Sequence, residues 1–318
     1  MKKKRLGNTD FEISVVGLGA WAMGGSGWQF GCGKQDDTDS IKAIRRAIDS
    51  GINWIDTAAV YGLGHSEEIV AKALKDLSEK PYVFTKCEQI WNEKGEISRT
   101  LKKDSIRKEC EASLKRLQTD VIDLYQLHWP TPDNEIEEGW EALQELKAEG
   151  KIKYAGVSNF NVQQLERISK IAPVSSMQPP YSLSRPAAEK ELVPYCEKNN
   201  LGLIVYSPMM SGLLSGKMSR EKIAALAEDD WRKTSPEFTE PKLTKNLQIA
   251  EKLKEIGTMK HVSAGAVAIA WTLRLSQVTG AIVGARNPEQ IDLLIEAGNL
   301  TLNDGDISQL NNAILSYS

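Results

Sequence analysis

The feature that most constrains the fold is a repeat in which a short apolar segment is followed by an amphipathic one. The apolar segments are nearly uninterrupted, as in strands that are buried on both faces of a parallel sheet. In the first amphipathic segment Ile41, Ile44, Ala47 and Ile48 share one helical face, and Gly51 suits a helix stop. The predicted strands are residues 14–19, 52–57, 82–86, 120–128, 153–159, 174–178, 201–207 and 279–285. The predicted helices are residues 38–51, 66–77, 104–118, 135–150, 161–171, 187–199 and 287–298.

The number of strands bears on how the sheet closes. Eight parallel strands joined by helical crossovers are enough to close a (β/α)8 barrel. No linker rich in Pro, Gly or Ser divides the 318 residues into two halves. An open, doubly wound sheet is the alternative, because periodicity predicts the elements and not their closure. We therefore predict an α/β fold with a single TIM barrel domain over residues 1–318. An N-terminal β-hairpin turned at residues 8–10 precedes it, and a long insertion separates strands 7 and 8.

A glycine pattern near the start favours a different fold at first sight. Residues 17–22, GLGAWA, match the spacing G-x-G-x-x-G/A with which a Rossmann turn binds a dinucleotide, and acidic residues follow at 36, 37 and 39. That fingerprint requires a helix to begin inside the glycine turn. Here the chain continues as MGGSGWQFGCG, where the glycines disfavour a helix, and the first convincing helix begins near Thr38. We interpret the match as a chance resemblance.

Charge and cysteine usage restrict the partners and the compartment. The 40 basic and 43 acidic residues leave a net charge of -3, so no basic footprint for nucleic acid or an anionic membrane is present. No apolar run approaches the length of a membrane span, and a polar stretch follows the initial MKKKR. Cys32, Cys87, Cys110 and Cys196 are widely spaced, which is typical of free thiols. The sequence thus predicts a cytoplasmic protein without nucleic-acid or membrane partners.

Polar residues end the apolar strands, and in a barrel those ends meet at one rim, where active sites of this fold lie. A ring of such residues is harder to attribute to chance than a single one. The expected rim consists of Gly19-Ala20-Trp21, Asp56-Thr57, Thr85-Lys86, His128, Ser158-Asn159, Gln178, Tyr206-Ser207 and Gly284-Ala285-Arg286.

Four residues near this rim form a set with a chemical role. A free tyrosine has a pKa near 10, and an adjacent lysine would lower the pKa of Tyr61 so that it exchanges protons more readily. Asp56 would keep Lys86 charged and oriented, and His128 would hydrogen-bond a substrate carbonyl. The three histidines of the sequence share no metal-ligand spacing, so no metal site is expected.

The chain resembles the aldo-keto reductases, the nicotinamide-dependent (β/α)8 family, over essentially its whole length. It is similar in style to the bacterial branch related to vegetative and inositol-operon reductases, and to potassium-channel β subunits. The motifs that carry the resemblance are VVGLGAWAMGG, NWIDTAAVYGLGHSEE, FTK, SLKRLQTDVIDLYQLHWP, GKIKYAGVSNF, MQPPYSL, VYSPMMSGLLSGK and IVGARNPEQ.

The resemblance implies an oxidoreductase that transfers a hydride from NADPH to the carbonyl of an aldehyde or ketone. By the match of motifs, Tyr61 is the proton donor, Lys86 the residue that lowers its pKa, Asp56 the partner of that lysine and His128 the substrate-orienting histidine. Around the nicotinamide the motifs place Ala20, Trp21, Ser158, Asn159, Gln178 and Tyr206, the last as the stacking aromatic.

The rest of the cofactor is implied to lie along the rim. The loop from Ser207 through Leu213 to Lys217 matches the pyrophosphate loop, and Gly284, Arg286 and Gln290 match the adenosine end. Arg286 could bind a 2′-phosphate, which favours NADPH over NADH. This chain departs from the family where it has Leu293 and Leu294 near the positions of a usual Glu-Asn pair, and where Ala20 replaces a common threonine, so that contact would be through the backbone only.

The substrate pocket is expected to be apolar and lined by Trp21, Trp91 and Trp129, with loops 87–100, 129–136 and 208–246 around it. Two other functions remain open. A desolvated Lys86 could attack a carbonyl as a Schiff-base aldolase does, although Asp56 would keep its amine protonated. Alternatively, the chain could bind NADPH as a redox-sensing regulatory subunit with little turnover.

Overall fold

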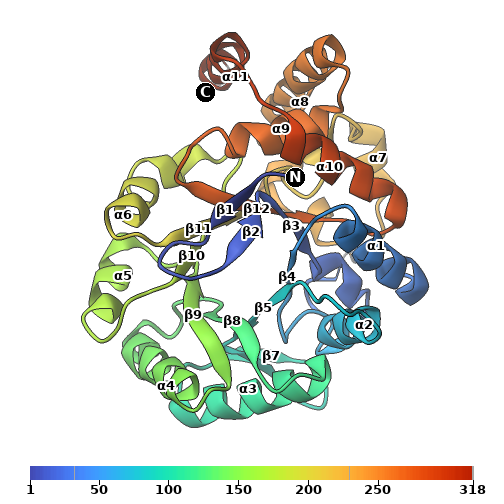
Figure 1. Cartoon of the computed structure of the whole chain (residues 1–318). Coiled ribbons are helices and arrows are strands. Elements are labelled where there is room, and N and C mark those ends of the chain that lie inside the picture. Colours follow the sequence, from blue (N-terminus) through green and yellow to red (C-terminus); the bar gives the residue numbers. More distant parts are fainter. Residues whose placement is uncertain (32, 229, 317–318) are drawn as a thin grey trace.

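Parallel strands close into a barrel of eight in the computed structural model, which describes residues 1–31, 33–228 and 230–316 (Figure 1). Each barrel strand pairs with the next in chain order, and the last pairs with the first. The predicted TIM barrel is therefore confirmed, and the open doubly wound sheet is not formed. The strands are β3 (Val16–Gly19), β4 (Trp54–Asp56), β5 (Tyr82–Cys87), β8 (Ile122–Leu127), β9 (Ile152–Ser158), β10 (Ser176–Gln178), β11 (Gly202–Tyr206) and β12 (Val278–Gly284).

Helices surround the barrel, as Figure 1 shows. Side-chain caps mark the first residues of several of these helices. The side chain of Asp36 accepts a hydrogen bond from the Asp39 N–H at the start of α1, and Asn161 and Gln164 form a capping box at the start of α5. The helices that follow the strands are α1 (Asp37–Asp49), α2 (His65–Leu74), α3 (Lys103–Leu117), α4 (Ile136–Ala148), α5 (Val162–Ser169), α6 (Leu192–Lys198), α9 (Ala264–Thr272) and α10 (Ile291–Asn299).

Several elements were not predicted from the sequence. A second hairpin, β6 (Gln89–Trp91) with β7 (Ile97–Arg99), follows β5. The predicted insertion between β11 and β12 contains α7 (Arg220–Ala224) and α8 (Lys242–Lys260), and α11 (Asp304–Ser316) ends the described chain. Every residue of α9 is buried, so its sequence lacks the polar face by which an amphipathic helix is detected.

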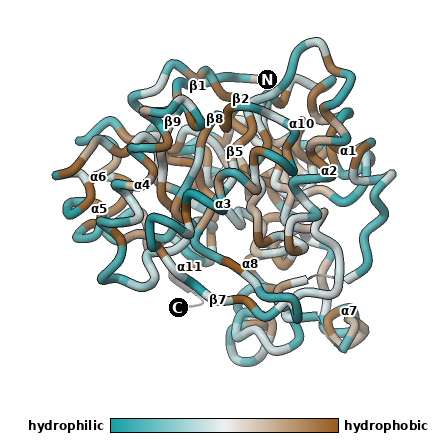
Figure 2. The backbone as a smooth tube through the Cα atoms, turned by 90° about the horizontal axis from the view of Figure 1, so that it is seen from below, coloured by the Kyte–Doolittle hydropathy of each residue, from teal (hydrophilic) through white to brown (hydrophobic). Residues whose placement is uncertain are grey.

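The N-terminal hairpin, β1 (Lys3–Arg5) with β2 (Glu12–Ser14), closes one end of the barrel. Leu6, Phe11 and Ile13 are buried in one cluster with side chains of the barrel interior. Figure 2, a side view of the barrel, shows β1 and β2 at one end and β7, α7 and α8 at the other. The amino ends of the strands are thus covered by the hairpin, and the added segments gather at the carboxyl ends.

Two layers of side chains fill the barrel, because alternate residues of a strand point to the same side. The layer nearer the hairpin is apolar and includes Trp54, Phe84, Leu124 and Ile204. Two positions further along each of these strands stand Asp56, Lys86, Gln126 and Tyr206. The strand periodicity therefore builds a polar layer directly above an apolar one.

The glycines of GLGAWA lie in this barrel wall and not in a dinucleotide turn. Gly17 and Gly19 belong to β3, and the next segment is a single 3-10 turn, η1 (Trp21–Gly24). A Cβ at Gly17 would stand 2.2 Å from Cε2 of Trp54, which fills the barrel beside it. The fingerprint is thus not a dinucleotide turn, as expected, and the structure adds that Gly17 is required by close packing.

We predict that Gly17→Ala lowers the free energy of unfolding by about 1–3 kcal/mol, because the added methyl overpacks the Trp54 ring. Urea denaturation measures the change. Gly284→Ala in β12 is the matched control, since a Cβ there meets only the Gly19 carbonyl oxygen at 3.7 Å. Equal losses for the two variants would contradict the packing explanation. In a Trp54→Leu background, Gly17→Ala should lower the free energy of unfolding by less than it does in wild type.

None of the helices in the described ranges combines the length and the apolar character that a membrane crossing requires.

Candidate active site

Lys86 and Asp56 form a buried ion pair at the centre of the polar layer. Lys86 Nζ donates to Asp56 Oδ1 at 2.6 Å and to the carbonyl oxygen of Thr57 at 2.8 Å, and it lies 3.5 Å from the hydroxyl of Tyr61. These contacts engage all three protons of the ammonium. Burial lowers the pKa of Lys86, and the Asp56 carboxylate opposes that change. The carboxylate thus keeps a charged lysine in a site where neither side chain meets appreciable solvent.

Tyr61 reaches this pair from the loop between β4 and α2. Its turn lies directly against η1, because a Cβ on Gly62 would stand 2.3 Å from the Gly24 carbonyl oxygen and only glycines allow so close an approach. Lys86 Nζ lies 5.2 Å from the centre of the Tyr61 ring. The backbone contact thus positions the loop that carries Tyr61, and Lys86 contacts the Tyr61 ring.

The expected lowering of the Tyr61 pKa is not found. Burial raises the pKa of the phenol well above its usual value, and the Asp56 carboxylate raises it further. The physical reason is that Asp56 compensates the charge of Lys86, so desolvation decides the balance. Tyr61 is accordingly held as the protonated phenol at neutral pH.

His128 stands across the site from Tyr61, with the two rings edge to face and their centres 5.8 Å apart. Burial lowers the pKa of His128 well below its usual value, and the nearby cations Lys86 and Arg99 add to the effect. The ring is therefore neutral at neutral pH. Gln89 Nε2 lies 3.1 Å from its Nδ1.

A chain of amides and hydroxyls continues the polar layer. Gln178 Nε2 donates to Asp56 Oδ2 at 2.9 Å and to Gln126 Oε1 at 3.2 Å. The Ser158 hydroxyl donates to the Gln178 carbonyl oxygen at 2.9 Å. Asn159 Nδ2 in turn donates to Ser158 Oγ and to the carbonyl oxygen of His128, each at 3.0 Å. The candidate residues from four strands are thereby brought into one connected network.

Comparison with known proteins identifies the family of this chain. A profile of the Aldo/keto reductase family matches residues 15–314. The chain belongs to the aldo/keto reductase family. It is therefore an oxidoreductase that acts on carbonyl compounds, and members of this family use nicotinamide cofactors.

Relatives of this aldo/keto reductase are similar over nearly their whole length. The aldo-keto reductase YhdN of Bacillus subtilis is 38% identical over 314 residues, which cover 98% of this chain and 93% of the relative. The NADH-specific methylglyoxal reductase of Escherichia coli is 35% identical, with 96% of each chain covered. Among solved structures, a glycerol dehydrogenase of Gluconobacter oxydans superposes with a TM-score of 0.90 at 36% identity, covering 99% of this chain and 96% of its own.

The loop after β11 has an unusual backbone. Ser207, Met210, Ser211 and Gly212 all have positive φ angles, between 51° and 93°. Within the described residues, no acceptor is bonded to the N–H groups of Met209 and Ser211. Unbonded N–H groups in such a turn can donate to an anion. Leu213 begins a buried 3-10 turn in this loop, and the exposed Lys217 follows it.

Tyr206 ends β11 at the edge of the same network. Its hydroxyl donates to Asn159 Oδ1 at 2.8 Å, and its ring is only half-buried. The ring therefore lies at the rim beside Asn159, and its role as a stacking aromatic stays a prediction.

The predicted adenosine residues cluster at the end of β12. Arg286 Nε donates to Gln35 Oε1 at 2.7 Å, and its Nη2 donates to the carbonyl oxygen of Lys34. The backbone N–H of Arg286 donates to Gln290 Oε1 at 2.8 Å, and Gly284 is exposed beside it. Gln35, which sequence reasoning missed, thus orients the arginine.

The departures from the family pattern have structural explanations. Leu294 is on the buried face of α10 and is fully buried, and Leu293 packs beside Gly265 of α9. Ala20 uses both of its backbone groups within the protein: its N–H donates to the Asp56 carbonyl oxygen at 2.8 Å, and its carbonyl oxygen accepts from Ser66 Oγ at 2.8 Å. Leu294 thus brings no polar side chain to the rim, and the Ala20 backbone already makes hydrogen bonds within the protein.

The three tryptophans expected around the pocket make different ring contacts. Trp21 packs against Trp231, with ring centres 5.9 Å apart, and Trp91 lies under the guanidinium of Arg116. Trp129 stacks beside His128, with ring centres 6.5 Å apart. The ring contact of Trp129 is thus with a predicted catalytic residue.

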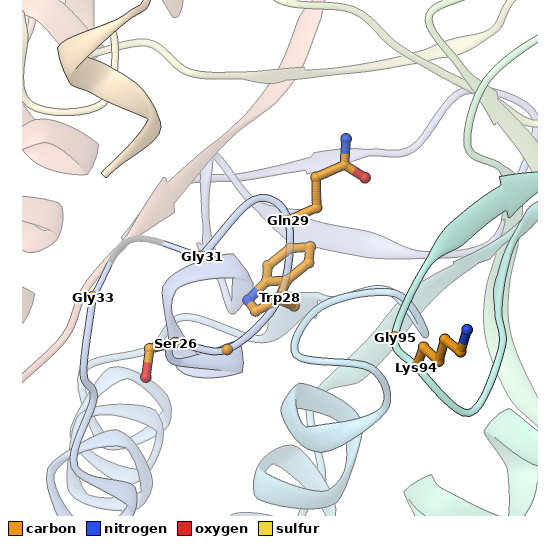
Figure 3. A pocket seen from close by; sticks show the side chains of 8 residues that line it. Ser26, Trp28, Gln29, Gly31, Gly33, Lys94 and Gly95 are labelled. Atoms are coloured by element: carbon orange, nitrogen blue, oxygen red, sulfur yellow. The ribbon is translucent and has the colours of Figure 1, made fainter. Parts of the chain in front are cut away.

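A cavity of about 430 Å³ opens between the glycine-rich loop after η1 and the turn of the β6–β7 hairpin (Figure 3). Trp28 borders this cavity, and its ring centre is 6.1 Å from that of Tyr61. Sequence reasoning identified loop 87–100 but missed the loop on the other side. The lining residues are Ser26, Gly27, Trp28, Gln29, Gly31, Gly33, Lys94 and Gly95.

Potential metal ligands and thiols can be located in the described parts of the chain. No group of three or more His, Cys, Asp or Glu side chains is arranged there to hold a metal ion. Cys87, Cys110 and Cys196 are buried free thiols, and the predicted free thiol at Cys32 lies outside the described residues.

Glu88 follows β5 and is buried behind the site, with Arg99 Nε 3.7 Å from its carboxylate. Burial raises the pKa of Glu88 to about 9, although Arg99 opposes the shift. Between the ordinary glutamate pKa and this value the folded chain keeps a proton that the unfolded chain has lost. The stability contributed by the neutral carboxyl is therefore complete at low pH and falls as the pH rises toward 9.

We predict that Glu88→Gln flattens this dependence. Its free energy of unfolding, relative to wild type, should increase by up to about 1.4 kcal/mol per pH unit between pH 6 and pH 8.5. Urea denaturation at the two pH values measures the change, and a constant penalty from the new amide cancels in the comparison. Parallel pH profiles for wild type and variant would contradict the raised pKa.

Proposed function

We propose that this aldo/keto reductase reduces the carbonyl of an aldehyde or ketone with NADPH, with Tyr61 as the general acid. The observation that carries the proposal is the buried Lys86–Asp56 pair with the Tyr61 hydroxyl 3.5 Å from the lysine and His128 on the opposite side.

The protein's own residues would act as follows. The neutral ring of His128 donates a hydrogen bond to the substrate carbonyl oxygen and orients it. As the carbonyl carbon takes up the hydride, the oxygen becomes an alkoxide, and Tyr61 donates its proton to it. Because an alkoxide is a far stronger base than a phenolate, the high pKa of Tyr61 does not prevent this transfer. The Lys86 ammonium stabilises the phenolate that is left, until a proton from solvent restores it.

The residues at the rim are suited to a nicotinamide dinucleotide, which supplies the hydride when it is bound. Ser158, Asn159 and Gln178 offer a hydroxyl and amides that complement a carboxamide. Tyr206 offers an aromatic face. The positive-φ loop after β11 and the exposed Lys217 offer N–H groups and a cation for the pyrophosphate.

NADPH is favoured over NADH by Arg286. Its guanidinium is oriented by Gln35 and by the Lys34 carbonyl oxygen, so a planar cation is held at the end of β12 where the adenosine would lie. The Escherichia coli relative is named NADH-specific, so a direct comparison of the two cofactors is the test of this preference.

We predict that Arg286→Ala weakens NADPH binding by about tenfold or more, because a charge-assisted contact to the 2′-phosphate is lost. NADH binding should change little. Fluorescence titration of both cofactors measures the difference, with Arg46→Ala as the control, since Arg46 pairs with Asp292 on the outer helices. Equal losses for NADPH and NADH would remove the 2′-phosphate role.

A Schiff-base aldolase would need Lys86 as a free amine. Burial favours that form, but the Asp56 carboxylate 2.6 Å away and the Thr57 carbonyl oxygen both bind the ammonium. Borohydride trapping with a carbonyl substrate tests the alternative, and we expect no covalent adduct at Lys86.

A further inference from the structure

The hairpin β6–β7 places a buried glutamine against the substrate-orienting histidine. Gln89 Nε2 lies 3.1 Å from His128 Nδ1, and both side chains are buried. We infer that Gln89 is a positioning residue that fixes the tautomer of His128, with the proton on Nε2. The inference deepens the proposed function and rests on it, because it specifies how His128 becomes a hydrogen-bond donor.

The tautomer follows from counting protons on the ring. A neutral imidazole carries one N–H donor and one acceptor nitrogen. His128 is desolvated beside the cations Lys86 and Arg99, which disfavour a second proton. We take the Gln89 amide in the orientation that places Nε2, which can only donate, 3.1 Å from Nδ1, so that Nδ1 is the acceptor; the reversed amide would require the other tautomer. The single ring proton must then lie on Nε2, on the opposite edge of the ring.

The tautomer of His128 decides whether the ring offers the substrate carbonyl a hydrogen-bond donor or a lone pair. With the proton on Nε2, the ring and the Tyr61 hydroxyl are both donors, and a carbonyl oxygen can accept from each. With the proton on Nδ1, the ring would present a lone pair that repels the carbonyl oxygen. That lone pair would also compete for the Tyr61 proton, since the two rings are edge to face with centres 5.8 Å apart.

The chain makes a strained turn to place Gln89 there. Glu88, the residue before it, has a φ of 96°, which is rare for a side chain with a Cβ and persists only where surrounding contacts enforce it. The Glu88 N–H donates to Glu109 Oε2 at 2.8 Å, and its carbonyl oxygen accepts from the Thr100 N–H at 3.1 Å. The backbone on both sides of the turn is thus held.

The partner strand ties the hairpin to the segment that carries His128. Arg99 is the register partner of Gln89, and its guanidinium lies 5.3 Å from the ring centre of Trp129, the residue after His128. The His128 backbone is itself fixed, because its N–H donates to the Cys87 carbonyl oxygen at 3.2 Å. Histidine and glutamine therefore belong to one rigid unit.

Nuclear magnetic resonance on the full chain labelled with nitrogen-15 histidine tests the inference without any substrate. His128 is assigned by the signals that disappear in His128→Asn. In wild type we expect the pattern of a neutral ring protonated on Nε2. In Gln89→Glu the carboxylate accepts a hydrogen bond from Nδ1–H, so the pattern should shift toward a ring protonated on Nδ1. A wild-type ring protonated on Nδ1, or the same pattern in both proteins, would overturn the inference.

Steady-state kinetics provide the second measurement. We expect Gln89→Leu to lower kcat/KM by about tenfold and Gln89→Glu by more, with cofactor affinity unchanged in both. The control is Gln144→Leu, which removes an amide of α4 whose Nε2 has no hydrogen-bond partner among the described residues. Equal rates for wild type and Gln89→Glu would overturn the role of Gln89. If wild type itself reduces no carbonyl compound while Nε2 carries the proton, the proposed function fails and the tautomer assignment is supported.

Discussion

Tyr61→Phe is expected to lower the rate of carbonyl reduction by about 10²–10⁴-fold, the usual contribution of a positioned general acid. The substitution removes the hydroxyl that lies 3.5 Å from Lys86 Nζ and leaves the ring in place. Because the hydroxyl acts only as charge develops on the substrate oxygen, kcat should fall far more than NADPH affinity. Single-turnover rates and a fluorescence titration of NADPH measure the two quantities separately.

Tyr125→Phe is the matched control for this change. Tyr125 is fully buried, but it lies in the outer core, where its hydroxyl interacts with the Cys87 thiol. Its activity should equal that of wild type. Retention of more than a tenth of wild-type kcat in Tyr61→Phe would contradict the role of Tyr61 as the acid.

Asp56→Asn is expected to destabilise the fold by about 3–5 kcal/mol, because it leaves a buried ammonium without its counter-ion. The side chains of Lys86 and Asp56 are 0% and 4% exposed, so water cannot replace the lost carboxylate. Raising the pH should recover part of the loss in the variant, since Lys86 can then become neutral. Urea denaturation as a function of pH measures both effects.

Asp292→Asn provides the contrast. Asp292 pairs with Arg46 on the surface, where both side chains are about half exposed and solvent screens the interaction. We expect little change in stability there. A loss in Asp56→Asn no larger than that in Asp292→Asn would mean that the central pair contributes nothing beyond an ordinary surface contact.

Much of the fold could be predicted because its determinants are local. The apolar strands and the helical periodicity between them predicted the barrel, and the polar strand ends predicted the positions of Asp56, Lys86 and His128. The helix α9 was missed because every one of its residues is buried, so its sequence has no polar face. The β6–β7 hairpin was missed because its strands have only three residues each.

The site was predicted less completely, because its missing members depend on contacts between distant segments. Gln126 could have been found from strand alternation, since it precedes His128 by two residues and follows Leu124 by two. Gln89 and Gln35 could not, because no local pattern indicates that one meets His128 and the other Arg286. The direction of the Tyr61 pKa also needed the structure, since it depends on how fully Asp56 compensates Lys86.

The source of the hydride is the property on which the proposed function depends most directly. A panel of aromatic aldehydes, short aldoses, methylglyoxal and inositol-like ketones, followed by NADPH oxidation, would first select a substrate. That substrate is then reduced by wild type with NADPH deuterated at both reactive positions of the dihydronicotinamide ring. Mass spectrometry should find one deuterium on the former carbonyl carbon of the alcohol. An alcohol without deuterium, or no NADPH oxidation with any member of the panel, would contradict the assignment of this chain as an NADPH-dependent carbonyl reductase.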